Sequence, residues 1–202
     1  MKKKLSLDFY LDEDVVSLSK NLLGKFLLTD LHGEGITGGM IVETEAYNGV
    51  IDKASHAHGN RRTKRTQIMY SEGGVAYVYM IYGFHFLFNV ITNIAEIPHA
   101  VLIRAIEPTE GIDVMLARRG HEALSPKLTS GPGLLSKALG ITKTENGESL
   151  LEDKIWIEDR GMKISKNQIL ASPRVNVGYA EEDALLPWRF RVKDNPYSSK
   201  AK

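Results

Sequence analysis

The sequence predicts an α+β fold whose sheet is mostly antiparallel. Segments with strand-like composition occur in blocks, and helical patterns stand between only some of them. A length of 202 residues with 43% hydrophobic and 25% charged residues is ordinary for one globular domain. Because no repeat, low-complexity tract or linker divides the chain, we expect a single domain over residues 1–202.

A helix and two strands are expected at the start of the chain. Asp12 or Asp14 is a suitable N-cap, and Gly24 ends the helix. Its buried stripe is formed by Val15, Leu18 and Leu22. A strand over residues 26–29, a glycine-containing turn and a longer strand over residues 36–47 follow.

The middle of the chain predicts a long loop and three strands. Residues 48–71 are polar and basic, and loops of this length are usually functional or disordered. Strands are expected over residues 75–82 and 84–92, with a turn near Gly83, and over residues 101–106.

Two helices and three short strands complete the prediction. Pro108 and Thr109 introduce a helix that runs through Arg118 and ends at Gly120. Ser130 is a candidate cap for the next helix, whose buried stripe is Leu134, Leu135, Ala138 and Leu139. The short strands are expected over residues 155–157, 174–178 and 189–192.

Side chains alternate along the strand at residues 36–47, and this alternation predicts a face with two carboxylates. One face is expected to carry Ile41, Glu43, Glu45 and Tyr47. The opposite face, which packs on the core, is expected to carry Met40, Val42, Thr44 and Ala46. A buried carboxylate is costly unless it is paired or used in chemistry. The acidic face is therefore a candidate site.

Arg104 interrupts an apolar strand and needs an acceptor, for which a carboxylate is the natural partner. A contact with Glu45 would keep that carboxylate ionised and could hold a water molecule between the two groups. An ionised carboxylate that touches water is a general base. A purely structural ion pair is the alternative, and these residues alone do not decide between the two.

Tyrosines alternate along the strand that ends at Gly83. Tyr77 and Tyr79 share one face, and packing is the usual role of such residues. Tyr82 and Phe84, however, flank the glycine of the turn, and an exposed aromatic turn has the shape of a wedge that enters a DNA duplex.

Composition limits the classes of function. The absence of cysteine excludes disulfides and thiolate metal sites. No apolar run reaches the ~18–20 residues of a membrane helix, and acidic residues interrupt the segment after the basic start, so we expect a soluble, cytoplasmic protein. His56 and His58 have Asp52 nearby but no third ligand at a typical spacing, so we expect no metal.

The net charge of +1 does not by itself indicate nucleic-acid binding. A local run is more informative, because four basic residues without an acid can steer a polyanion. They are Arg61, Arg62, Lys64 and Arg65. A solvated surface loop is the alternative interpretation.

Several of these segments together resemble the alkyladenine (3-methyladenine, N-methylpurine) DNA glycosylases. The similarity extends from about Leu7 to about Val192. It is carried by residues 41–47, 77–83, 101–108 and 130–132, with His56 and Asn89. The resemblance implies a curved antiparallel sheet with a protruding hairpin that intercalates in DNA. It also implies a monomeric, monofunctional glycosylase without metal or cofactor, which acts on double-stranded DNA containing damaged purines.

The resemblance also assigns roles to residues. Glu45 would activate the attacking water, and Arg104 and the main-chain carbonyl of Val175 would position it. The extruded base would lie between Tyr47 on one side and His56 and Tyr79 on the other. Asn89 would lie at the pocket floor and disfavour the exocyclic amine of guanine. Tyr82, with Phe84 beside it, would fill the gap left in the duplex. The DNA backbone would be contacted by Arg61, Arg62, Lys64 and Arg65.

This chain departs from the family pattern at five positions, which are Thr66 for a usual asparagine, Phe84 for methionine, Leu134 for lysine, Asn176 for glycine and Arg191 for tyrosine. The change at Leu134 removes a phosphate or structural contact, and Asn176 is expected to shift the Val175 carbonyl. Both bear on affinity and substrate range more than on the type of reaction. The residues indicate no acid that would protonate a neutral leaving base.

Two other functions fit part of the pattern. A non-catalytic binder of distorted or single-stranded nucleic acid would use the tyrosines for stacking, but it leaves Glu45 and Arg104 without a role. A hydrolase of free nucleosides would need neither Tyr82 at an exposed turn nor the basic run.

Overall fold

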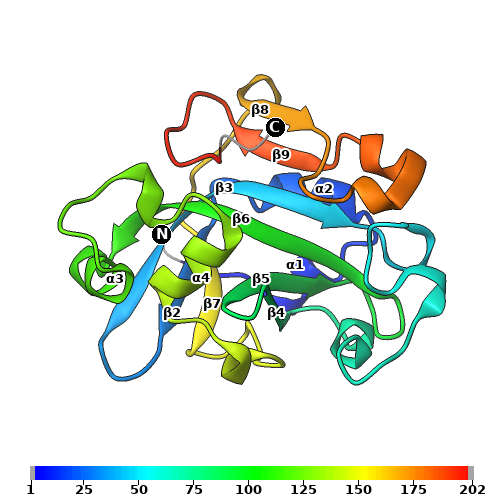
Figure 1. Cartoon of the computed structure of the whole chain (residues 1–202), viewed down its shortest axis with the longest axis horizontal. Coiled ribbons are helices and arrows are strands. Elements are labelled where there is room, and N and C mark those ends of the chain that lie inside the picture. The colour runs from blue at the N-terminus through cyan, green and yellow to red at the C-terminus, as the bar shows by residue number, and fades with distance from the viewer. Residues whose placement is uncertain (1–2, 200–202) are drawn as a thin grey trace.

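The computed structural model of the protein describes residues 3–199. All nine strands within these residues belong to one curved sheet, and every pairing between them is antiparallel (Figure 1). The strand order is β1-β7-β2-β3-β6-β5-β4, and β9 attaches β8 to β3. The predicted α+β class with a mostly antiparallel sheet is confirmed. The strands are β1 (Lys3–Lys4), β2 (Phe26–Asp30), β3 (Ile36–Tyr47), β4 (Val75–Ile81), β5 (His85–Thr92), β6 (His99–Glu110), β7 (Ile155–Asp159), β8 (Ile169–Ser172) and β9 (Arg189–Val192).

Four α-helices in the described part of the chain flank the sheet, and two of them confirm sequence signals. They are α1 (Leu7–Tyr10), α2 (Val15–Asn21), α3 (Ile112–Arg119) and α4 (Pro132–Leu139). Asp14 caps α2 by accepting the N–H groups of Val16 and Ser17. Gly120 ends α3 in the left-handed conformation, as predicted.

Between residues 3 and 199, seven 3-10 helices lie in the connecting segments, and three of them order the long polar loop. These three are η1 (Gly49–Ile51), η2 (His58–Asn60) and η3 (Gln67–Tyr70). The others are η4 (Pro126–Leu128), η5 (Lys143–Glu145), η6 (Lys166–Gln168) and η7 (Gly178–Leu185). No helix within residues 3–199 has the length and apolar character needed to cross a membrane.

Two predicted helix starts are wrong. Pro108 and Thr109 do not start a helix, because β6 continues to Glu110, and Gly111 is the N-cap of α3. Ser130 does not cap α4, because its backbone forms a bridge with Ala105 and Gly131 is the N-cap.

The strand predicted over residues 174–178 does not form, and a strand lies instead over residues 169–172. Asn176 explains the difference, because its φ of 60° is a left-handed conformation that an extended strand does not contain.

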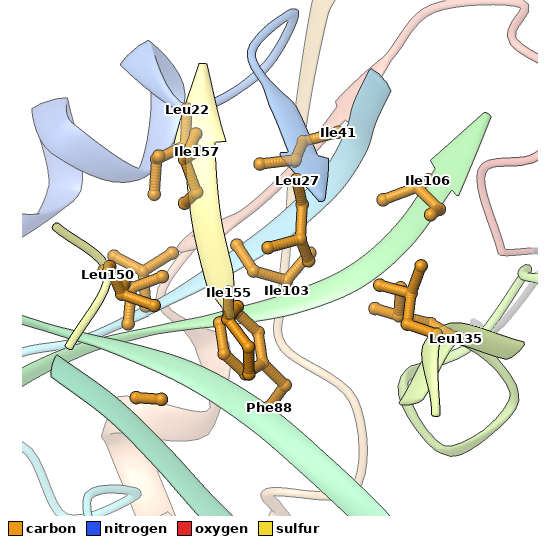
Figure 2. Packing of buried hydrophobic residues seen from close by; sticks show 14 of the residues in the cluster. Leu22, Leu27, Ile41, Phe88, Ile103, Ile106, Leu135, Leu150, Ile155 and Ile157 are labelled. Carbon is orange, nitrogen blue, oxygen red and sulfur yellow. The ribbon is translucent and has the colours of Figure 1, made fainter. Parts of the chain in front are cut away.

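The main hydrophobic core joins the sheet to the helices. Leu22 at the C-cap of α2, Leu27 of β2, Ile103 and Ile106 of β6 and Leu135 of α4 all contribute to it (Figure 2). These side chains come from distant parts of the sequence, so the core fixes the path of β3 and β6 through the molecule.

The unbroken alternation of side chains predicted for β3 is wrong at Ile41. Ile41 points into the main core (Figure 2). Ala46 belongs to the same core, although unbroken alternation would place the two residues on opposite faces. The register with β6 shifts between Ile41 and Glu43 and again between Glu43 and Thr44. This irregularity changes which face each residue occupies, since a one-residue slip exchanges the faces of a strand.

Candidate active site

Glu45 of β3 is completely buried and accepts contacts from three donors. Its Oε1 atom accepts the N–H of Val175 at 2.8 Å and lies 3.2 Å from an NH1 of Arg104. Its Oε2 atom accepts the hydroxyl of Tyr47 at 2.9 Å. The expected contact between Arg104 and Glu45 is therefore present. Since a carboxylate offers about four acceptor positions, one remains for a water molecule.

Glu43 is the second buried carboxylate, and cationic side chains enclose it. Its Oε1 atom accepts the Nε–H groups of Arg104 at 2.7 Å and Arg189 at 2.8 Å, as well as the hydroxyl of Ser199 at 2.8 Å. Burial alone would raise the pKa of Glu43, but the two guanidinium groups outweigh it and hold the pKa below its usual range. Glu43 is thus a fixed anion inside the protein.

The acid faces a cavity of about 390 Å³ that collects several of the predicted residues. Glu45, Tyr47, His56, Tyr79, Arg104 and Val175 all line it. They come from β3, the long polar loop, β4, β6 and the segment before η7. An adjoining space of about 40 Å³ shares Tyr47, His56 and Tyr79 and is also lined by Asn89. Neither space is lined by Glu43, so Glu45 is the carboxylate that could meet a ligand.

His56 is held between a cation and a phenol. The NH2 of Arg65 lies 3.1 Å from Nε2 and 3.4 Å from Nδ1 of His56. Nδ1 also shares a hydrogen bond of 2.8 Å with the hydroxyl of Tyr77. Burial, together with the charges of Arg65 and Arg61, lowers the pKa of His56 to about 4. The imidazole is consequently neutral at physiological pH.

Asn89 of β5 has its amide group fixed by the backbone. Its Nδ2 atom donates to the carbonyls of Tyr77 at 3.0 Å and Leu87 at 3.4 Å. Its side-chain oxygen accepts no hydrogen bond from the described residues, and the residue borders the smaller space. An acceptor is thus available where a base edge could lie.

Aromatic side chains project from the turn between β4 and β5. Tyr82 is 74% exposed and Phe84 69% exposed, and the ring of Phe84 lies 4.3 Å from that of His85. Tyr82 adopts a φ of 52° and Gly83 one of 78°, which makes the turn tight. Tyr82 also lines the cavity, so the turn stands at its edge.

The four basic residues predicted to contact the DNA backbone differ in their surroundings. Arg62 is paired with Glu96 and lies 3.7 Å from the ring of Tyr70. Arg65 lies 4.7 Å from the ring of Tyr79. Arg61 and Lys64 form no ion pair with residues 3–199. Arg61 and Arg65 line a further cavity of about 510 Å³ next to the candidate site.

Sequence reasoning missed an ion pair that supports the cavity wall. Arg174 donates to both oxygens of Asp52, at 2.5 and 2.9 Å, and both side chains are fully buried. The guanidinium of Arg174 also lies 4.8 Å from the ring of Tyr47. The only signal was a cation in a segment wrongly predicted to be a strand.

Tyr179 was also missed, although it lines all three spaces. It is 65% exposed, and its hydroxyl donates to the carbonyl of Ala54 at 3.1 Å. Within residues 3–199, no three His, Cys, Asp or Glu side chains are grouped as metal ligands.

Comparison with known proteins gives consistent matches along nearly the whole chain. Residues 8–196 match the family described as methylpurine-DNA glycosylase. A Chlamydia felis protein named "Putative 3-methyladenine DNA glycosylase" is 49% identical over 184 residues, which cover 90% of this chain and 92% of that protein. Proteins of the same name from Bacillus cytotoxicus and Clostridium novyi are 47% and 42% identical. These two alignments cover 95% and 98% of this chain and 97% and 99% of the respective relatives.

Proposed function

The chain belongs to the methylpurine-DNA glycosylase family and is a DNA glycosylase of base excision repair, and we propose that its substrates are alkylated or deaminated purines in duplex DNA. It flips 3-methyladenine or a related base out of the helix and hydrolyses the N-glycosidic bond. The products are the free base and an abasic site. A monofunctional reaction needs only water as the second reactant.

Access to the bond requires the base to leave the duplex, at a cost of a few kcal/mol that is smallest for a damaged or weakly paired base. The exposed Tyr82 is suited to occupy the gap, with Phe84 beside it. Arg61 and Arg65 line the neighbouring cavity and Lys64 is exposed in the same loop, so these cations could meet phosphates. Arg65 would have to leave His56 to do so, and Arg62 would have to loosen its pair with Glu96.

The cavity suits a cationic purine. Purines alkylated at a ring nitrogen carry positive charge, and aromatic faces attract such cations by about 0.5–2 kcal/mol. Tyr47 and Tyr79 supply the faces. His56 adds a neutral ring, because its pKa of about 4 leaves no charge to repel the base. The side chain of Asn89 borders the smaller space, where its bulk would disfavour the exocyclic amine of an undamaged guanine.

The hydrolysis follows from the contacts of Glu45. A water molecule on its remaining acceptor position, oriented by Arg104 and by the Val175 main chain, loses a proton to the carboxylate and attacks C1′. The C1′–N bond breaks, and its electron pair leaves with the purine. The same negative charge stabilises oxocarbenium character on the sugar, as in glycoside hydrolysis. A cationic purine needs no further proton to leave.

A single observation supports this proposal most strongly, namely that Glu45 is buried, held by three donors and open to an aromatic cavity. The test is chromatography of free bases released from alkylated, hypoxanthine-containing and ethenoadenine-containing duplexes. We expect release of 3-methyladenine by the parent protein, none by Glu45→Gln, and parental release by Glu152→Gln, a change at an exposed position.

Two outcomes would contradict the proposal. If Glu45→Gln releases purine at the parental rate, Glu45 is not the general base. Tight, salt-sensitive binding of lesion DNA by the parent protein without any release would favour the non-catalytic binder instead. The monomeric state and the cytoplasmic location stay predictions.

A further inference from the structure

We propose that Glu43 and Ser199 are positioning residues for the catalytic carboxylate, which they reach through Arg104. This inference rests on the proposed role of Glu45 as the general base. Neither Glu43 nor Ser199 lines the cavity that Glu45 faces, so neither would touch the substrate.

Arg104 is the link between the two carboxylates. Its Nε donates to Oε1 of Glu43 at 2.7 Å, while its NH1 lies 3.2 Å from Oε1 of Glu45. The guanidinium is planar and rigid, so a short bond at Nε fixes the position of NH1 as well. The longer contact with Glu45 therefore depends on the shorter one with Glu43.

Glu43 is itself held from two further directions. Arg189 of β9 donates its Nε–H to Oε1 at 2.8 Å. Ser199 donates its N–H to Oε2 at 2.5 Å and its hydroxyl to Oε1 at 2.8 Å. Glu43 is completely buried, which leaves these contacts in a setting where charged hydrogen bonds are strong.

The segment that carries Ser199 also has contacts with β6 and β9. It follows β9, which lies beside β3 in the sheet (Figure 1). Asn195 donates its side-chain amide to Glu107 of β6 at 2.7 Å and its backbone N–H to the carbonyl of Val192. Ser199 also accepts two contacts from Arg189, at 2.9 and 3.1 Å. Contacts thus run without a break from this segment through Glu43 and Arg104 to Glu45.

The chain offers a matched pair of variants for the test. Ser199→Ala removes the hydroxyl bond to Glu43 and keeps the backbone N–H. Ser198→Ala removes a neighbouring hydroxyl that contacts only the carbonyls of Val42 and Val192, at 3.4 and 3.3 Å. Glu43→Gln keeps the size of the side chain and removes its charge.

The rate of base release under single-turnover conditions is measured for each variant. The dissociation constant for a duplex with a tetrahydrofuran abasic analogue and the thermal midpoint of unfolding are measured alongside. We expect Glu43→Gln to slow release by about 10- to 100-fold, as a displaced catalytic contact does. Ser199→Ala is expected to slow it by about 3- to 10-fold, and Ser198→Ala to leave it unchanged. Binding of the abasic analogue should stay within about threefold of the parent value, because only the reacting step is affected.

A double variant separates positioning from general damage. If Glu43 and Ser199 act through one series of contacts, Ser199→Ala adds little once Glu43→Gln is present, whereas independent defects multiply. The inference is overturned if Glu43→Gln releases base at the parent rate, or if rate, binding and thermal midpoint fall together. Should Glu43→Gln not fold, the serine pair decides, and equal rates for Ser199→Ala and Ser198→Ala overturn it.

The two proposals fail in different ways. If the parent protein is active and Glu45→Gln is inactive, but the Glu43 and Ser199 variants behave like the parent, only the positioning role is lost. If Glu45→Gln is as active as the parent, the proposed function is lost first.

Discussion

The hydroxyl of Tyr47 donates to Oε2 of Glu45 over 2.9 Å, so one residue both forms an aromatic wall of the cavity and holds its acid. Burial and the nearby Glu45 charge raise the pKa of Tyr47 well above its usual value, which keeps the phenol protonated as the donor.

Replacing Tyr47 with phenylalanine should separate these two roles. The ring remains, but the carboxylate loses a donor, and a hydrogen bond to a charged group contributes about 1.5–3 kcal/mol. We expect base release to slow by about tenfold or more with little change in affinity for lesion DNA. Tyr79→Phe is the control, because the Tyr79 hydroxyl has no hydrogen bond with the described residues. Equal losses in both variants would contradict the role of the Tyr47 hydroxyl.

Tyr82→Ser should impair activity on duplex DNA much more than any activity on single-stranded substrate. The wedge is needed only where a base must be replaced in a stack. Because Tyr82 is 74% exposed, its loss should leave the thermal midpoint nearly unchanged. Leu185→Ser, at a residue 76% exposed that lines neither space at the acid, tests for a general effect of losing an exposed apolar side chain. An equal loss on both substrates would exclude a wedge.

The lowered pKa of His56 predicts that the folded protein loses stability in mild acid. Its pKa falls from 6.5 to about 4 on folding, so between these values the unfolded chain binds a proton that the folded chain excludes. The free energy of unfolding should therefore decline as the pH falls from about 6.5 to about 4. Urea titrations at pH 7 and pH 5 should show a smaller decline for His56→Gln than for the parent. The exposed His58, replaced in the same way, should leave the decline unchanged.

The Asp52–Arg174 pair should contribute much more to stability than an ion pair on the surface. Both side chains are fully buried, and Asp52→Asn leaves a buried guanidinium without its partner charge. Such a change typically costs about 3–5 kcal/mol. Lys154→Gln removes the exposed pair with Glu148, which solvent screens, and should cost far less. Urea denaturation compares the two, and similar losses would contradict the prediction.

Asn176 should tolerate glycine but not a β-branched residue. Its φ of 60° is accessible to glycine and asparagine and strained for valine. We expect Asn176→Gly to keep both stability and base release, and Asn176→Val to lose about 1–3 kcal/mol and to slow release, because Val175 contacts Glu45. Thermal unfolding and base release are measured for the two variants. An Asn176→Val protein with the stability and the release rate of the parent would refute the prediction.

The sequence predicted most strands and helices because local patterns determine them. The strand over residues 36–47, the cap at Asp14 and the glycine after α3 all depend on neighbours a few residues away. The contact between Arg104 and Glu45 was predictable for a different reason, since a buried cation in a strand needs a carboxylate and few were available.

The errors arise where distant contacts override local preference. Pro108 remains in β6 because its strand continues beside Gly39, and Ser130 is drawn into a bridge with Ala105. The partners of Glu43 were not predictable either, since Arg189 and Ser199 lie about 150 residues away and no pattern in the chain links them.

The irregularity in β3 has a consequence for how this enzyme could be altered. It divides the strand into two halves, and the core determines separately in each half which side chains point inward. Ile41 packs in the core in the first half, and Ala46 packs there in the second. Removing one residue between them would rotate Glu45 toward α2 and bring Ala46 to the cavity, although every functional residue would still be encoded. The number of residues between Ile41 and Glu45 is therefore as essential to the chemistry as the carboxylate of Glu45 itself.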